Sequence, residues 1–173
     1  MSLRDSKRFL PKIDLDPPQY YAQVTGEIAL RWTRLEYQLG VLVRVITRLR
    51  KAEQRSMLDG QHAKSHCRLL KVLAVAMVHD RDPAAAEEVR QLAVDAEKGA
   101  DRRDDFVHSM YGVWVHATSE PLRFRLRSAK NGIMSHEPAS LDDLRTFAKH
   151  VCELQDQAQT LTERMKALFG SRR

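Results

Sequence analysis

Three side chains that can hold an anion and move protons lie within six consecutive positions, namely Arg103, Asp104 and His108. Residues four apart on a helix lie one above the other, so Asp104 and His108 share a face, and Asp104 is placed to orient the imidazole. Arg103 lies further round the helix, but we expect its long side chain to reach the same cleft. A guanidinium binds phosphate oxygens and an imidazole exchanges protons near neutral pH. The three residues are therefore candidate catalytic residues for phosphodiester chemistry.

The spacing of arginine and histidine is not informative by itself, because Arg145 and His150 repeat it. Context distinguishes the two pairs. The first pair has Asp104 one turn before the histidine and precedes Ser-Met-Tyr-Gly-Val-Trp, where the helical period gives way to strand-like alternation. The second pair lies within a continuing heptad pattern, which is typical of a charged outer face. Only the first pair is interpreted as a candidate site.

The charge balance favours a polyanionic partner, since the net charge of the 173 residues is +6. Arg102 adjoins the motif, and Arg123 and Arg125 share one face of a predicted strand, so these three residues are candidate RNA contacts. Cys67 and Cys152 form no CxxC pair, and no apolar stretch reaches the roughly 20 residues of a membrane span. We expect a cytoplasmic protein without membrane contact.

Two further residues near the motif each have a structural and a functional interpretation. Glu36 is either a surface carboxylate or a supporting residue that orients Arg103 across the bundle. Tyr111 is three residues beyond His108 and either stacks on a base of the substrate or packs in the core. His62 and His66 have a spacing that can bind a metal, but no nearby carboxylate completes a ligand set, so we expect neither a metal nor a cofactor.

The apolar periodicity predicts a mainly α chain, a four-helix bundle with two long helices and a small β-hairpin insertion between the third and last helices. The predicted segments form one domain over 1–173, with an arm at 1–15, helices at 16–50, 61–78, 83–111 and 140–169, and the hairpin at 113–127. The predicted helix boundaries are N-caps at Asp16, Asp82 and Ser140 and glycine ends at Gly112 and Gly170.

Two helices carry apolar residues at steps of three and four, a pattern typical of helices that pack along most of their length. In the first helix these are Val24, Ile28, Trp32, Leu35, Leu39, Leu42, Ile46 and Leu49. In the last they are Leu144, Phe147, Val151, Leu154, Ala158, Leu161, Met165 and Leu168. The second helix is predicted to turn inward Cys67, Leu70, Leu73, Ala74 and Met77.

Two stretches resemble the HEPN superfamily, and in particular a group of uncharacterised bacterial proteins. One is Trp–x–x–Leu–Glu–x–x–Leu, here residues 32–39, and the other is Arg–Asn/Asp–x–x–Val–His–x–x–x–Gly–x–Trp, here residues 103–114. Asp104 stands where this group commonly has Asn. The resemblance implies a four-helix bundle that dimerises so that two motifs meet in one cleft.

The resemblance also implies a function, a metal-independent endoribonuclease of a toxin–antitoxin or other defence system. Such an enzyme leaves 2′,3′-cyclic phosphate and 5′-hydroxyl ends, and its partners would be RNA, a second copy of the chain, and an antitoxin or nucleotidyltransferase. Two alternatives remain open: a non-catalytic module that binds a nucleotide, an RNA or a protein, and a purely structural homodimer. The ribonuclease requires Arg103 and His108 to face a solvent cleft, whereas the structural homodimer predicts that both are buried and paired within one chain.

Overall fold

The computed structural model describes residues 13–14, 19–50, 62–114, 121–126 and 134–170. Its helical elements are α1 (Gln19–Thr47), α3 (Ala63–Leu73), the π-helical turn η1 (Ala74–Val78), α4 (Pro83–Val107) and α5 (Leu141–Phe169). Its strands are β1 (Ile13–Asp14), β2 (Met110–Trp114), β3 (Leu122–Leu126) and β4 (Met134–Pro138). The predicted N-cap at Asp16 and most of the arm lie outside the described residues.

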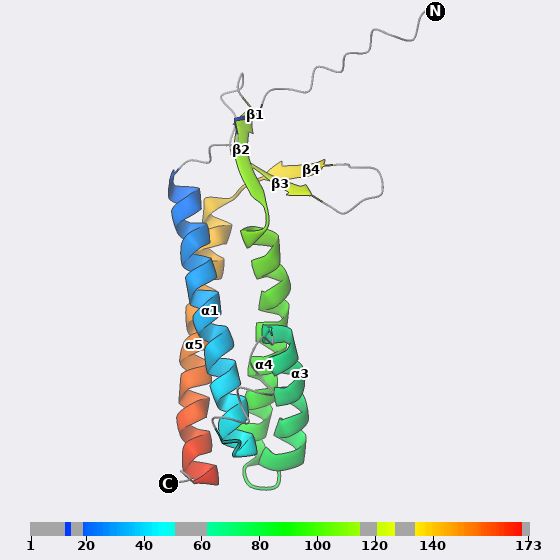
Figure 1. Cartoon of the computed structure of the whole chain (residues 1–173), viewed down its shortest axis with the longest axis vertical. Helices are drawn as coiled ribbons and strands as arrows, with labels where there is room; N and C mark the ends of the chain where they lie inside the picture. Colours follow the sequence, from blue (N-terminus) through cyan, green and yellow to red (C-terminus); the bar gives the residue numbers. More distant parts are fainter. Residues whose placement is uncertain (1–12, 15–18, 51–61, 115–120, 127–133, 171–173) are drawn as a thin grey trace, which may run out of the picture.

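The mainly helical four-helix bundle predicted from the sequence is confirmed (Figure 1). The longest contact runs between α1 and α5, which lie side by side along the bundle. The apolar seams are the two sets of residues predicted at steps of three and four on the first and last helices. They are buried except for Val24, Leu49 and Leu168, which are half-buried, and Trp32 of α1 stacks near Phe147 of α5 with ring centroids 6.4 Å apart. The 29 residues of each helix span roughly 44 Å, and the two seams supply most of the largest fully buried side chains.

Side-chain caps fix two of the helix starts as predicted. The Asp82 carboxylate accepts from the Ala85 amide at 3.0 Å, and the Ser140 hydroxyl accepts from the Asp143 amide at 3.1 Å. Gly170 follows α5 with φ of 75°, the left-handed conformation in which glycine has no steric penalty. These caps set where α4 and α5 begin and hence which of their residues face α1.

The second helix differs from the prediction at its C-terminal end, where five residues form the π-helical turn η1. A π turn inserts one extra residue per turn, which shifts the buried face along the sequence. Val78 is therefore fully buried and Met77, predicted to point inward, is 36% exposed. The prediction for Met77 is wrong because it assumed one uninterrupted α-helical period.

The third helix ends earlier than predicted, at Val107 and not near Tyr111. His108 is its C-cap, and Met110 and Tyr111 already belong to β2. The strands form a sheet in the order β1-β2-β3-β4, with antiparallel pairing of β2 to β3 and of β3 to β4. The antiparallel pairing of β2 with β3 begins at Met110, earlier than the hairpin predicted over 113–127. The 115–120 connection lies outside the described residues, so the predicted hairpin is not shown as a whole.

The short α3 leaves one side of the bundle open. In Figure 1, α3 lies beside the half of α4 that is remote from the sheet, while α4 continues past the start of α3 towards β2. Beyond Ala63, no helix of the described residues lies across the facing parts of α1 and α4. This difference in helix length positions the candidate site.

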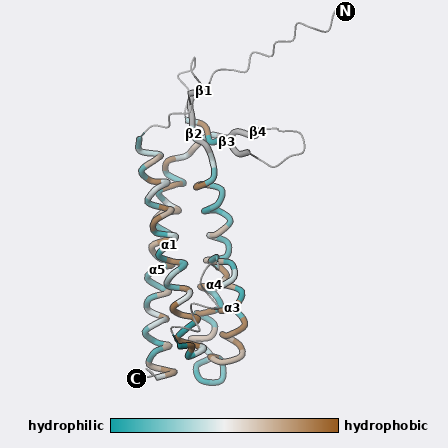
Figure 2. Tube along the Cα trace, viewed as in Figure 1, coloured by the Kyte–Doolittle hydropathy of each residue, from teal (hydrophilic) through white to brown (hydrophobic). Residues whose placement is uncertain are grey.

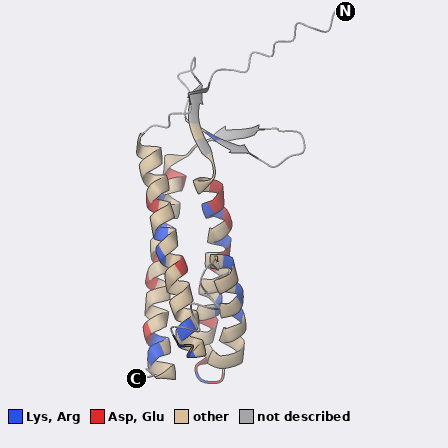
Figure 3. Cartoon of the chain, viewed as in Figure 1, with Lys and Arg blue, Asp and Glu red and all other residues tan. Residues whose placement is uncertain are grey.

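Polar and apolar residues alternate around the helices (Figure 2), as expected for amphipathic bundle helices. Lys and Arg are interspersed with Asp and Glu along the described helices (Figure 3), so the positive net charge is not gathered on one helix. Within the described residues, none of the helices has the length and apolar character needed to cross a membrane.

Candidate functional site

An open pocket of about 310 Å³ lies where α3 begins, between α1 and α4. Its lining residues are Trp32 and Glu36 from α1, His62, Ala63 and Lys64 from the start of α3, and Ala100, Arg103, Asp104 and His108 from α4. We call it the α3-end cleft. The fold thus brings together Arg103, Asp104, His108 and Glu36, the residues chosen from the sequence as catalytic and supporting.

The floor of the α3-end cleft is the buried ring of Trp32. Trp32 is 1% exposed, and Gly99 of α4 packs against its ring, since a Cβ at Gly99 would lie 3.1 Å from Cζ3 of Trp32. A larger residue at this position would require the indole or α4 to shift by a few tenths of an ångström. The close approach fixes the height of the next turn of α4, which carries Arg103.

Arg103 is three-quarters buried, and its Nη1 donates to the Asp104 carboxylate at 2.9 Å. Its Nε is shielded from solvent and has no hydrogen-bond partner among the residues that the structure describes. A guanidinium with one edge unused can still bind an anion there after a small movement of the side chain. The Asp104 side chain of this ion pair is half exposed, so water screens the attraction between the two charges.

Asp104 does not play the role expected from its spacing. The carboxylate was expected to orient His108, but it pairs with Arg103, and His108 instead donates its backbone amide to the Asp104 carbonyl oxygen at 3.1 Å. The helix ends at this point, so His108 is an exposed C-cap residue at the rim of the cleft. The predicted Asp104–His108 side-chain pair is therefore corrected to an Arg103–Asp104 pair.

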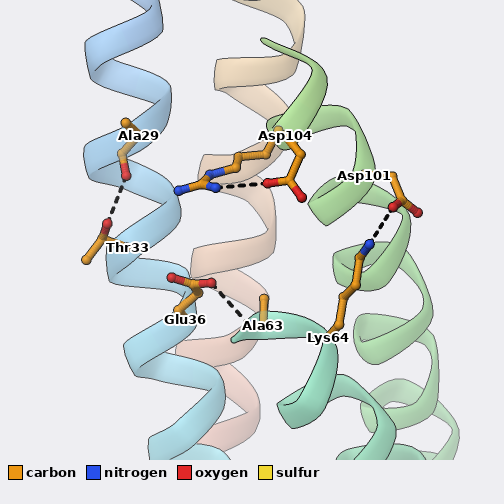
Figure 4. Close-up of polar contacts among 8 residues, drawn as sticks. Ala29, Thr33, Glu36, Ala63, Lys64, Asp101 and Asp104 are labelled. Carbon is orange, nitrogen blue, oxygen red and sulfur yellow. Dashed lines mark hydrogen bonds and ion pairs between the residues drawn. The ribbon is translucent and has the colours of Figure 1, made fainter. Parts of the chain in front are cut away.

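Glu36 lies in the cleft but contacts a different group from the one expected. Its Oε1 accepts from the backbone amide of Ala63 at 3.1 Å, the first residue of α3 (Figure 4). The amides at a helix start lack partners within the helix and carry partial positive charge, so a carboxylate is favourable there. Glu36 therefore fixes the start of α3 against α1, and the structure shows no direct contact with Arg103 among the described residues.

Lys64 closes the opposite side of the cleft. Its ammonium lies 2.5 Å from the Asp101 carboxylate of α4 (Figure 4). The hydrogen bond to Asp101 raises the pKa of Lys64 above its ordinary value, so the group stays cationic at neutral pH. The cleft thus holds two cations, Arg103 and Lys64, each balanced by a carboxylate of α4.

The residues predicted to contact substrate lie elsewhere. Arg102 and Arg123 line a second pocket of about 160 Å³ at the start of α5, outside the α3-end cleft. Both guanidinium groups lie over the Phe106 ring, at 5.5 and 4.9 Å from its centroid. Both arginines therefore pack against an aromatic core residue. The side chain of Arg125 lies outside the described residues.

Tyr111 is buried, which favours the core interpretation over stacking on a base. It is 7% exposed, its ring lies 5.6 Å from that of Tyr21, and its hydroxyl donates to the Phe106 carbonyl oxygen at 3.0 Å. Most of the ring is therefore covered, and Tyr111 also lines the second pocket together with Arg102 and Arg123. The sequence had left both possibilities open.

Comparisons with family models, with curated proteins and with solved structures find no match. The HEPN resemblance therefore remains a prediction from the two sequence stretches. Within the part of the chain that the structure describes, no cluster of three or more His, Cys, Asp or Glu residues could hold a metal ion.

Sequence reasoning missed two residues of the cleft, His62 and Lys64. Both were assigned to the second helix with no link to the motif on α4. The sequence feature that could have identified them is their position at the start of a short helix. Residues at the start of such a helix in a bundle lie next to the space that the helix does not fill. Their position became evident only when the length of α3 was known.

Proposed function

We propose that this protein is a HEPN-like, metal-independent endoribonuclease whose site is the α3-end cleft. The observation that carries the proposal is that one open pocket collects Arg103, Asp104 and His108. His108 is exposed and Arg103 is accessible through the pocket, as the ribonuclease requires.

In the proposed reaction, His108 accepts the proton of the 2′-hydroxyl, and the 2′-oxygen forms a bond to phosphorus as the bond to the 5′-oxygen breaks. Arg103 stabilises the negative charge that grows on the phosphoryl oxygens. A second group protonates the leaving 5′-oxygen. The products are a 2′,3′-cyclic phosphate and a 5′-hydroxyl.

The resemblance extends the proposal beyond this reaction to a cytoplasmic toxin or defence protein that acts as a homodimer, with an antitoxin or nucleotidyltransferase as a possible partner class. The free thiols of Cys67 and Cys152 are compatible with a reducing compartment.

The alternative is a non-catalytic module that binds a nucleotide, an RNA or a protein in the same cleft. It is favoured by one observation, the ion pair of Arg103 with Asp104, which offers the guanidinium a partner other than phosphate. A purely structural homodimer has less support, because His108 is exposed at the rim of the cleft and is not buried in the chain.

The test is incubation of the purified protein with structured RNA in EDTA, comparing wild type with Arg103→Ala and His108→Ala. We expect metal-free cleavage by the wild type, with rates lower by about 10²-fold or more in either variant, because each removes a group that acts in the transition state. Product ends are checked for 2′,3′-cyclic phosphate.

The matched control is the Arg145→Ala/His150→Ala double variant, which removes the same residue types at the same spacing from α5. It should cleave like the wild type. Equal loss in the control, or cleavage that survives His108→Ala, would remove the proposed site. RNA binding without cleavage would favour the binding module.

A further inference from the structure

We infer that His62 is the proton donor of the proposed reaction, so that one chain supplies both the base and the acid. The inference rests on the proposed function. It differs from what the HEPN resemblance implies, which is that two motifs from two chains meet in one cleft. The observation behind it is that His62 and His108 line the same pocket, on different helices.

The positions of the two imidazoles relative to Arg103 support this role. Lys64, two residues after His62, reaches the Asp101 carboxylate of α4 with its side chain (Figure 4), so the start of α3 lies within the length of a lysine side chain of Asp101. His108 is seven residues further along α4, which is roughly 11 Å, or two turns. Arg103 lies between Asp101 and His108 along the chain. A phosphodiester bound at Arg103 would therefore have one imidazole towards each end of the cleft. The reaction requires this arrangement, because one imidazole accepts the 2′-hydroxyl proton and the other donates a proton to the 5′-oxygen.

The imidazole of His62 has no structural task in the described part of the chain. His62 occupies the N-cap position of α3, yet its side chain makes no capping hydrogen bond. Glu36 contacts the adjacent amide of Ala63 instead. The His62 backbone is nevertheless fixed, because its carbonyl oxygen accepts from the Ser65 amide at 2.9 Å. The imidazole of His62 is thus exposed to solvent while its backbone is fixed, so the ring is available to contact a bound ligand.

The proton balance of the step closes within one chain. His108 begins neutral and takes the 2′-hydroxyl proton, while His62 begins protonated and gives its proton to the 5′-oxygen as the phosphorus–oxygen bond breaks. Both rings are exposed to solvent, so water returns each to its starting state. No metal, oxidant or second protomer enters the step.

The experiment compares two substrates in EDTA: an RNA oligonucleotide, whose leaving alkoxide needs a proton, and uridine 3′-(4-nitrophenyl phosphate), whose leaving phenolate does not. His62→Ala should slow RNA cleavage by about 10²–10⁴-fold and leave release of 4-nitrophenolate within about threefold of wild type. His108→Ala should slow both reactions, because both need the base. His79→Ala is the control, an exposed histidine at the far end of η1 that should leave both rates unchanged.

The outcomes separate the two proposals. If the wild type cleaves neither substrate, the ribonuclease proposal and this inference both fail. If the wild type cleaves RNA and His62→Ala does so equally fast, the ribonuclease stands and His62 is not the acid. If His62→Ala keeps its thermal midpoint but slows both substrates equally, His62 positions the substrate and the inference is wrong.

Discussion

At the scale of single residues, the pairing of Arg103 with Asp104 determines how strongly the cleft can bind a phosphate. Nη1 of Arg103 is 2.9 Å from the carboxylate, so an incoming phosphate must compete with Asp104 for the guanidinium. The Asp104 side chain is 53% exposed, and an ion pair with this exposure contributes only about 0.2–1 kcal/mol. Under the proposed function, Asp104 would lower the affinity of the cleft for a phosphate without blocking it.

Asp104→Asn removes this competing charge and keeps the shape of the side chain. We expect the dissociation constant for a 2′-O-methyl RNA to fall by about 1.4–5-fold at fixed salt, the equivalent of that ion-pair energy. Fluorescence anisotropy measures it, and Asp95→Asn on the same helix provides the same charge change away from the cleft. Weaker binding by Asp104→Asn alone would show that the carboxylate holds Arg103 in its binding position.

The residue types of the cleft were predictable, but their contacts were not. Spacing on a helix identified Arg103, Asp104 and His108, since it depends only on the helical period. It did not reveal that the helix ends at His108, which turns the imidazole from a mid-helix side chain into an exposed cap. Glu36 and Tyr111 each had two interpretations because packing across helices decides between them.

At the scale of elements, the helices were predictable where local chemistry defines them. Asp82 and Ser140 start α4 and α5 as their capping chemistry requires, and the two apolar seams identify the faces that pack. The π turn η1 and the early end of α4 were not predictable, because both reflect how a helix is accommodated by its neighbours. The residue at which α3 starts also depends on the neighbouring helices, and its position determines where the cleft lies.

The contact between α1 and α3 contains a buried histidine with consequences for stability. His66 is 5% exposed, and in the described part of the chain neither of its ring nitrogens has a hydrogen-bond partner. Its Cε1 would lie 3.5 Å from a Cβ at Gly40. Burial lowers the pKa of His66 below its ordinary value, with Glu36 acting in the opposite direction. Folding therefore favours the neutral ring.

Stability should consequently fall in mild acid. The unfolded chain binds a proton at His66 below about pH 6.5, whereas the folded chain does so only at lower pH, so the unfolded state gains protons first as the pH falls. We expect this residue to reduce the free energy of unfolding by up to about 1.4 kcal/mol per pH unit below that point. Urea unfolding of wild type and His66→Leu at about pH 5 and pH 7.5 measures it. An equal pH dependence in the two proteins would contradict the assignment.

At the scale of the whole molecule, the cleft results from unequal helix lengths. Two 29-residue helices, α1 and α5, form the length of the bundle, and α4 joins them, but α3 covers only part of α4. The uncovered part faces Trp32 and Glu36 and collects the polar residues of three helices. The sequence predicted the number of helices and their seams. It could not predict this opening, because helix length and position along the bundle follow from the connections as well as from the periodicity.

The most direct test is a titration of the protein with a 2′-O-methyl RNA, which cannot be cleaved, while the histidine Hε1 resonances are followed by NMR. Binding of a phosphodiester in the α3-end cleft predicts that the His108 and His62 signals move together and saturate, that His79 stays in place, and that Arg103→Ala abolishes the change. A shift spread equally over all seven histidines, or no shift at His108 while RNA binds, would contradict the cleft as the RNA site.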